Sequence, residues 1–140
     1  MKLYSVIFCL IFLTGCIKEK NNPLLGLWEN NREKTLTILK NSNSVPASIL
    51  HCYESKLCGN SALNFTSEYV HTILKNKRGL VISDDERPYK LISILSDRIK
   101  VVYDDEEEFN IYLERNEFYV ELEFEGYEYK EFYKRTTVNL

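Results

Sequence analysis

The clearest structural signal in this chain is the stretch Phe118-Tyr119-Val120-Glu121-Leu122-Glu123-Phe124-Glu125. Apolar side chains alternate along it with Tyr119 and three glutamates. Successive side chains of a β-strand point to opposite faces, so this period of two predicts a strand with one buried face and one wet face.

The same period continues on both sides of this strand. It predicts strands at 99–103, 109–113 and 127–135, and further alternation from Tyr89 onward. The connections at 96–97, at 115–116 and at Gly126 are short enough only for hairpins between antiparallel neighbours. Alternation is poorer in the last strand, and a bulge near Lys130 would restore its register.

Upstream of Tyr89 the pattern is weaker. It predicts strands at 26–30, 35–39, 68–74 and 80–82, with a turn at 76–79. The total of about eight or nine antiparallel strands favours an all-β fold, either an up-and-down barrel or a strongly curved sheet. Residues 45–60 interrupt the series as an insert after the second predicted strand. Within it we expect a short helix at 47–56, with Ser44 as a possible cap and Pro46 in the first turn.

Composition limits the class of protein. The 140 residues suffice for one domain with a core. A formal net charge of −3, from 18 basic and 21 acidic residues, provides no basic field for nucleic acid. Ten tyrosines against one tryptophan suit half-buried sheet faces.

The first residues read as a targeting segment. Lys2 precedes an apolar run at 3–12 that is too short to span a bilayer. The run ends in Leu13-Thr14-Gly15-Cys16, which resembles a bacterial lipobox. The resemblance implies a signal peptide at 1–15, acylation of Cys16 and a polar tether at 16–22. Because residue 17 is not Asp, it also implies a lipid-anchored protein of the outer membrane that faces the periplasm.

The cysteines agree with this assignment. Cys9 would leave with the signal peptide and Cys16 would carry lipid, so Cys52 and Cys58 remain as a pair in an oxidising compartment. We expect a disulfide, which requires the chain to turn between them because six helical residues hold two Cα atoms too far apart. A metal site that adds His51 is the alternative, although the spacing fits no zinc pattern.

Two ends of the chain carry a family resemblance. Gly26-Leu27-Trp28 resembles the Gly-x-Trp motif that begins the first strand of lipocalin-like barrels. Arg135 resembles the family's last-strand arginine, which packs on that tryptophan. The resemblance implies a lipocalin-like barrel over 23–135, closed by Gly26, Trp28 and Arg135, with a tail at 136–140.

The sequence argues against an enzyme, a cofactor or a metal site. The acidic runs at 83–86 and 104–108 read as solvated hairpin tips, because neither has the ligand spacing of a calcium loop. His51 and His71 are the only imidazoles, and His71 reads as a hydrogen-bonded sheet residue. The motifs of hydrolases and nucleotide-binding loops are absent from the sequence.

Tyrosines form a candidate partner surface on the last three strands, since rigid amphipathic rings are typical of binding surfaces. They are Tyr112, Tyr119, Tyr127, Tyr129 and Tyr133. Two functions follow as hypotheses. The first is a membrane-anchored binding protein that holds a small apolar ligand or lipid in its barrel. The second is a protein inhibitor or immunity protein that neutralises a toxin or hydrolase in the periplasm through its acidic, tyrosine-rich surface.

Overall fold

The structure of the protein is a computed structural model that describes residues 22–104 and 106–137. The predicted signal peptide, Cys16, the tether up to residue 21 and the last three residues of the tail lie outside the described residues.

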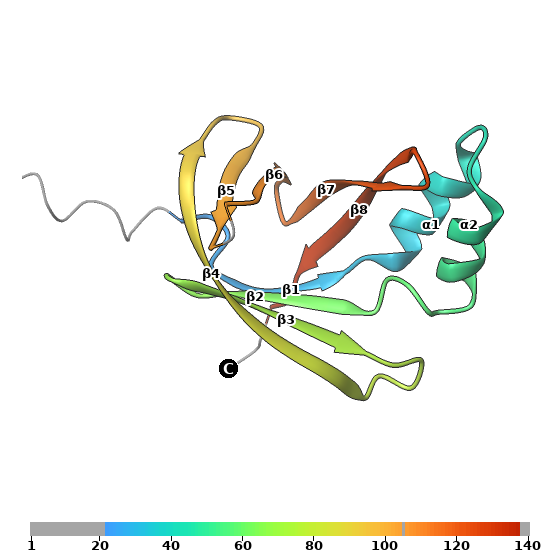
Figure 1. The fold of residues 1–140 in the computed structure, drawn as a ribbon, viewed down its shortest axis with the longest axis horizontal. Coiled ribbons are helices and arrows are strands. Elements are labelled where there is room, and N and C mark those ends of the chain that lie inside the picture. The colour runs from blue at the N-terminus through green and yellow to red at the C-terminus, as the bar shows by residue number, and fades with distance from the viewer. Residues whose placement is uncertain (1–21, 105, 138–140) are drawn as a thin grey trace, which may run out of the picture.

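The described chain forms a closed antiparallel barrel of eight strands with two helices between the first and second strands (Figure 1). The strands are β1 (Gly26–Asn30), β2 (Ser61–Phe65), β3 (Tyr69–Lys75), β4 (Val81–Ile94), β5 (Ile99–Tyr103), β6 (Glu108–Glu114), β7 (Glu117–Phe124) and β8 (Tyr127–Arg135). The helices are α1 (Arg32–Asn41) and α2 (Ala47–Glu54). Each strand pairs with its neighbours in sequence, and β8 returns to β1. The expected all-β, up-and-down barrel is confirmed, and it fits the lipocalin-like description.

The alternation of β7 sets the two faces of the barrel wall. Phe118 is fully buried and Val120 packs against the core, whereas Glu121 and Glu123 are exposed. Residues on the inner face of every strand meet in one apolar core. Its buried members are Leu24, Trp28, Phe65, Val70, Tyr89, Ile99, Val101, Ile111, Phe118 and Tyr133.

One end of the barrel, here called the base, is closed where β1 begins. The Arg135 guanidinium lies 4.3 Å from the ring of buried Trp28. It also donates hydrogen bonds to the carbonyl oxygens of Pro23 and Leu25, at 2.6 and 2.9 Å. At Gly26 the backbone has φ +113°, a conformation that side chains disfavour. The last strand is therefore joined to the segment that leads into the first.

The prediction of a strand at 35–39 is wrong, because these residues belong to helix α1. The Asn31 side chain caps the helix by accepting a hydrogen bond from the Lys34 amide at 3.3 Å. Thr35 and Leu39, one helical turn apart, are the buried residues of α1. The insert consequently follows β1, and it holds two helices where we expected one.

Helix α1 takes over the edge of β8 at Phe132, directly beyond the last residue that β1 reaches. Strand β1 pairs with β8 only from Trp28 opposite Arg135 to Asn30 opposite Tyr133. Beyond this point the Asn31 amide donates to the Phe132 carbonyl at 2.7 Å, and the Phe132 amide donates to Thr35 Oγ1 at 3.1 Å. The helix thus satisfies a strand edge that would otherwise be open.

The predicted bulge near Lys130 is also wrong. The register between β7 and β8 runs without a shift from Glu117 opposite Lys134 to Phe124 opposite Tyr127. Phe132 departs from the apolar face because it points outward, where Lys34 of α1 lies 4.4 Å from its ring. The irregular alternation of β8 therefore results from a helix that packs on its outer face and not from a bulge with an inserted residue.

Three further elements differ from expectation. The acidic run at 83–86 lies inside the 14-residue strand β4, where pairing with β3 sets His71 Nε2 2.8 Å from the Glu86 carboxylate. The hairpin tip expected there is therefore wrong, whereas residue 104 and residues 106–107 do connect β5 to β6. Strand β2 was not foreseen. The predicted helix at 47–56 is confirmed as α2, although it begins after Pro46 without the expected side-chain cap and ends at Glu54.

Thr35→Val should lower the free energy of unfolding by about 1–3 kcal/mol, because it leaves the buried Phe132 amide without its acceptor while keeping the side chain's shape. Thr37→Val is the matched control, since its exposed hydroxyl donates to the Glu33 carbonyl of its own helix. It should change stability by less than about 0.5 kcal/mol. Urea unfolding of both variants is the measurement, and equal effects would contradict the role assigned to α1.

Candidate functional site

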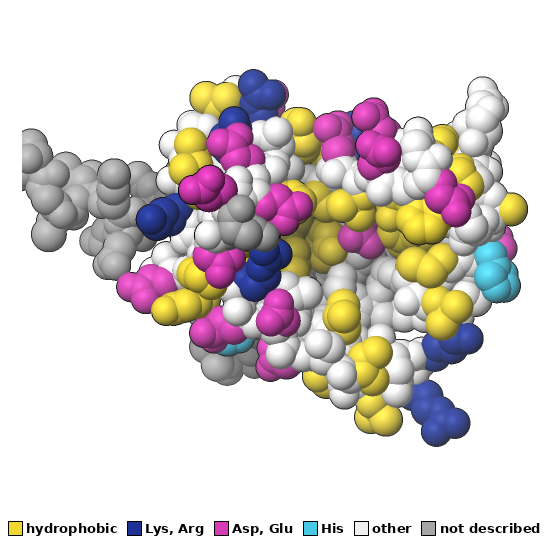
Figure 2. All heavy atoms as spheres, in the orientation of Figure 1, with side chains coloured by type: hydrophobic (Ala, Val, Ile, Leu, Met, Phe, Trp, Pro, Cys, Tyr) yellow, Lys and Arg dark blue, Asp and Glu magenta, His cyan; other side chains and the backbone are white. Residues whose placement is uncertain are grey.

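The end of the barrel opposite the base, here called the mouth, is hollow. Figure 2 shows this face hollowed at its centre, with hydrophobic side chains lining the hollow and acidic side chains around much of its rim. In a closed barrel an inward side chain reaches solvent only through an end. The inward side chains that are partly exposed include Tyr103, Phe109, Val120 and Leu122, and Phe124 near the rim is 46% exposed.

Aromatic rings fill the barrel below the hollow. Trp28 and Phe118 are in contact at 4.8 Å between ring centroids, and Phe118 stacks on Tyr133 at 4.9 Å. Phe65 adds edge contacts to Phe118 and to Tyr89. The base half is therefore solid core, and a ligand inside the barrel could occupy only the mouth half.

A carboxylate, Glu131, lies on the inner face of β8 within this region. The Tyr53 hydroxyl donates to Glu131 Oε1 at 2.6 Å, and the Tyr133 hydroxyl donates to Glu131 Oε2 at 2.8 Å. Ser61 Oγ of β2 lies 3.2 Å from the Tyr133 hydroxyl. Residues from α2, β2 and β8 thus converge on one acidic group.

The phenols of this cluster remain protonated. Burial and then the negative charge of Glu131 raise the pKa of Tyr53 and of Tyr133 far above the ordinary value. Burial also raises the pKa of Tyr129, whose ring meets that of Tyr53 edge-on at 6.2 Å. The hydroxyls of Tyr53 and Tyr133 therefore act as neutral donors to the carboxylate.

The insert positions Tyr53. Together with Leu39 and Ile49, its side chain forms a second buried apolar cluster, against which Tyr127 and Tyr129 pack. The Cys52–Cys58 disulfide, with 5.2 Å between its Cα atoms, ties the end of α2 to the loop before β2. The predicted disulfide is confirmed, so neither sulfur is a free thiolate for a metal.

In a comparison with known proteins, no protein-family model matches the chain and no curated protein sequence matches it. The site is therefore interpreted from its own geometry.

The five tyrosines of the predicted partner surface do not share a face. Tyr112 and Tyr119 stack in parallel on the outer face, 4.7 Å apart. Tyr127, Tyr129 and Tyr133 pair with inward residues of β7 and lie inside. The hairpin at Gly126 provides the missing signal, because Phe124 opposite Tyr127 fixes which side the β8 tyrosines take.

Sequence reasoning did not single out Glu131, Tyr53 or Ser61. Glu131 could have been found as a charged residue on the strand face that carries Tyr127 and Tyr129. The sequence holds no comparable signal for Tyr53, because its place depends on the path of the insert.

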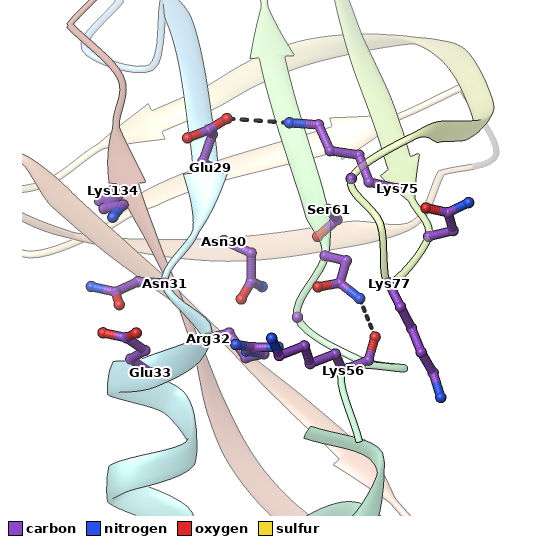
Figure 3. Close-up of a pocket in the computed structure, with 14 residues that line it drawn as sticks. Glu29, Asn30, Asn31, Arg32, Glu33, Lys56, Ser61, Lys75, Lys77 and Lys134 are labelled. Carbon is purple, nitrogen blue, oxygen red and sulfur yellow. Dashed lines mark hydrogen bonds and ion pairs between the residues drawn. The ribbon is translucent and has the colours of Figure 1, made fainter. Parts of the chain in front are cut away.

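Two other hollows lie outside the mouth. A polar pocket of about 420 Å³ lies between β1, the start of α1, β2 and β3 (Figure 3). It carries charges of both signs, including the Lys75–Glu29 ion pair at 3.3 Å. A more apolar groove of about 730 Å³ follows β4 at the base, where Ile92 and Ile94 are half exposed.

The remaining predicted positions form no site. His51 is exposed on α2. Across residues 22–104 and 106–137, no group of three or more histidine, cysteine or acidic side chains is placed to hold a metal ion. No helix in the same part of the chain is long and apolar enough to cross a membrane.

The free energy of unfolding should fall as pH rises above 10.0, the ordinary tyrosine pKa. Above that pH the unfolded chain releases phenol protons that folded Tyr53 and Tyr133 retain, so deprotonation favours unfolding. Tyr53→Phe removes one such group, and its slope should be shallower by up to about 1.4 kcal/mol per pH unit. Urea unfolding at several alkaline pH values measures both slopes, and parallel slopes would contradict the assigned environment of Tyr53.

Proposed function

We propose that this chain is a non-enzymatic binding protein that holds a small, largely apolar ligand in the mouth of its barrel. The observation that supports this is the row of inward, partly exposed apolar side chains above a solid core, ending in Phe124. Water in contact with these side chains would be released when a ligand covers them, at roughly 25 cal/mol for each Å² of apolar surface.

The tyrosine distribution favours this function over the protein-partner alternative. An inhibitor or immunity protein would use the outer surface, yet three of the five candidate tyrosines line the interior. Of these five, Tyr112 and Tyr119 lie on the outer face. Part of their surface is covered, because the two rings stack on each other and Lys130 lies 4.2 Å from the Tyr119 ring.

We further propose that the protein is anchored through Cys16 to the outer membrane. The described chain begins at the base, where the Asn22 side chain donates to the Tyr89 hydroxyl at 2.7 Å. An anchor attached just before Asn22 would therefore hold the base, and the mouth at the opposite end would stay open to the periplasm.

Cys16→Ser should move the protein from the membrane fraction to the soluble fraction of cells and abolish labelling by radioactive palmitate, because one thiol carries the acyl chains. Cys9→Ser is the matched control, since that residue would leave with the signal peptide. Its product should remain in the membrane and keep the label. Release of both variants, or of neither, would contradict anchoring at Cys16.

Leu122→Asp should weaken binding of the neutral fluorescent probe N-phenyl-1-naphthylamine by about tenfold or more, because it sets a charge on the apolar wall of the mouth. Ile92→Asp makes the same change at the apolar groove of the base. That variant should bind as the wild type does. Fluorescence titration of the folded variants measures both affinities. Weaker binding by Ile92→Asp than by Leu122→Asp would show that the ligand binds in the base groove and not in the mouth.

A further inference from the structure

In the part of the chain that the structure describes, no basic side chain forms an ion pair with Glu131. Within residues 22–104 and 106–137 its polar contacts are the hydroxyls of Tyr53 and Tyr133, which donate hydrogen bonds but carry no charge. The lysines beside it in sequence face outward, since Lys130 covers the outer ring of Tyr119 and Lys134 is exposed. Glu131 is partly exposed, so a cation can approach its carboxylate, and the attraction between the two charges is stronger beside apolar walls than in bulk water.

The neighbours of Glu131 suit a cation that carries carbon. Across the β7–β8 pair, Val120 lies opposite Glu131 and Leu122 lies opposite Tyr129. Tyr129 shares the inner face with Glu131 and is half-buried. Aromatic rings attract organic ammonium groups through their negative faces, with greater effect where water is excluded. A carboxylate, a tyrosine ring and an aliphatic wall therefore meet in the mouth.

The acidic turns at the mouth also favour a ligand with a positive charge. The turn between β5 and β6 carries Asp104, Glu106 and Glu107, and the turn between β7 and β8 carries Glu125, whereas the turn between β3 and β4 at the same end carries Lys77 and Arg78. On the inner face of β4 the basic side chain is Arg87, which lies over the Tyr103 ring at 4.8 Å with Asp104 3.9 Å away. The acidic side of the rim, next to the β7–β8 pair that carries Glu131, raises the local concentration of cations and lowers that of anions.

We propose that the mouth binds an organic ammonium ion with an apolar body. The ammonium group lies against Glu131 and the Tyr129 ring, and the apolar body covers Val120, Leu122 and Phe124. This inference rests on the proposed function, because it specifies the charge of the ligand that the barrel holds.

The test compares three ligands with the same eight-carbon tail: octyltrimethylammonium, octyl sulfate and octanol. Isothermal titration calorimetry of the protein with its disulfide intact gives the three affinities at low salt. The wild type should bind the ammonium ligand at least about tenfold more tightly than octanol, and octyl sulfate more weakly than octanol. Glu131→Gln should remove the preference for ammonium over octanol.

Glu123→Gln is the matched control, because it makes the same change in net charge on the outer face of β7, where Glu123 is exposed. It should keep the preference. If Glu131→Gln does not fold, as judged by circular dichroism, Tyr129→Leu replaces it, and the ammonium affinity should fall several-fold more than the octanol affinity.

The outcomes separate the two claims. Equal affinities for ammonium and octanol in the wild type, or a preference that survives Glu131→Gln, would overturn the inference and leave the proposed function standing. Tighter binding of octyl sulfate would do the same. Failure of all three ligands to bind would overturn both.

Discussion

The barrel depends on how β8 is completed along its edge, because β1 is too short to pair with all of it. Five residues of β1 meet nine residues of β8, and only three pairs form. Directly beyond these pairs, Asn31 and the buried hydroxyl of Thr35 in α1 satisfy the edge of β8 at Phe132. A β-barrel whose first strand ends early needs such a cover, since open strand edges pair with other chains. The helices are thus part of the closure of the wall.

The shape of the mouth is a consequence of the way in which α1 completes β8. Once α1 lies along β8, α2 is held beside the inner face and brings Tyr53 to Glu131. The disulfide fixes the end of α2, and the aromatic core at Trp28 and Phe118 keeps the lower half solid. A rigid, half-filled barrel with one carboxylate among tyrosines is the result. Its base is held by Arg135 and its mouth is left for a ligand.

The sequence predicts the second half of the barrel well, because tight hairpins make its pairing local. It predicts the first half poorly. The segment at 35–39, expected to be a strand, is a helix, whereas β2 is a strand that was not expected. The strands expected at 80–82 and from Tyr89 are a single strand, β4. The predicted number of strands was therefore close to eight because these errors partly cancelled. A short apolar run is compatible with the period of a strand or of a helix. At 35–39 the helix is favoured by the cap at Asn31 and by the hydrogen bond from the edge of β8 to Thr35. The site was missed for a related reason, since Tyr53 meets Glu131 only after the insert folds back.

The central claim is that a ligand enters the mouth and contacts the inner faces of β7 and β8. Backbone amide chemical shifts, followed by NMR while octyltrimethylammonium is added, test it most directly. The account predicts that the largest shifts lie in residues 120–124 and 127–131, with the base of β4 unaffected. Shifts concentrated around Ile92 and Ile94, or on the outer face around Tyr112, would contradict it.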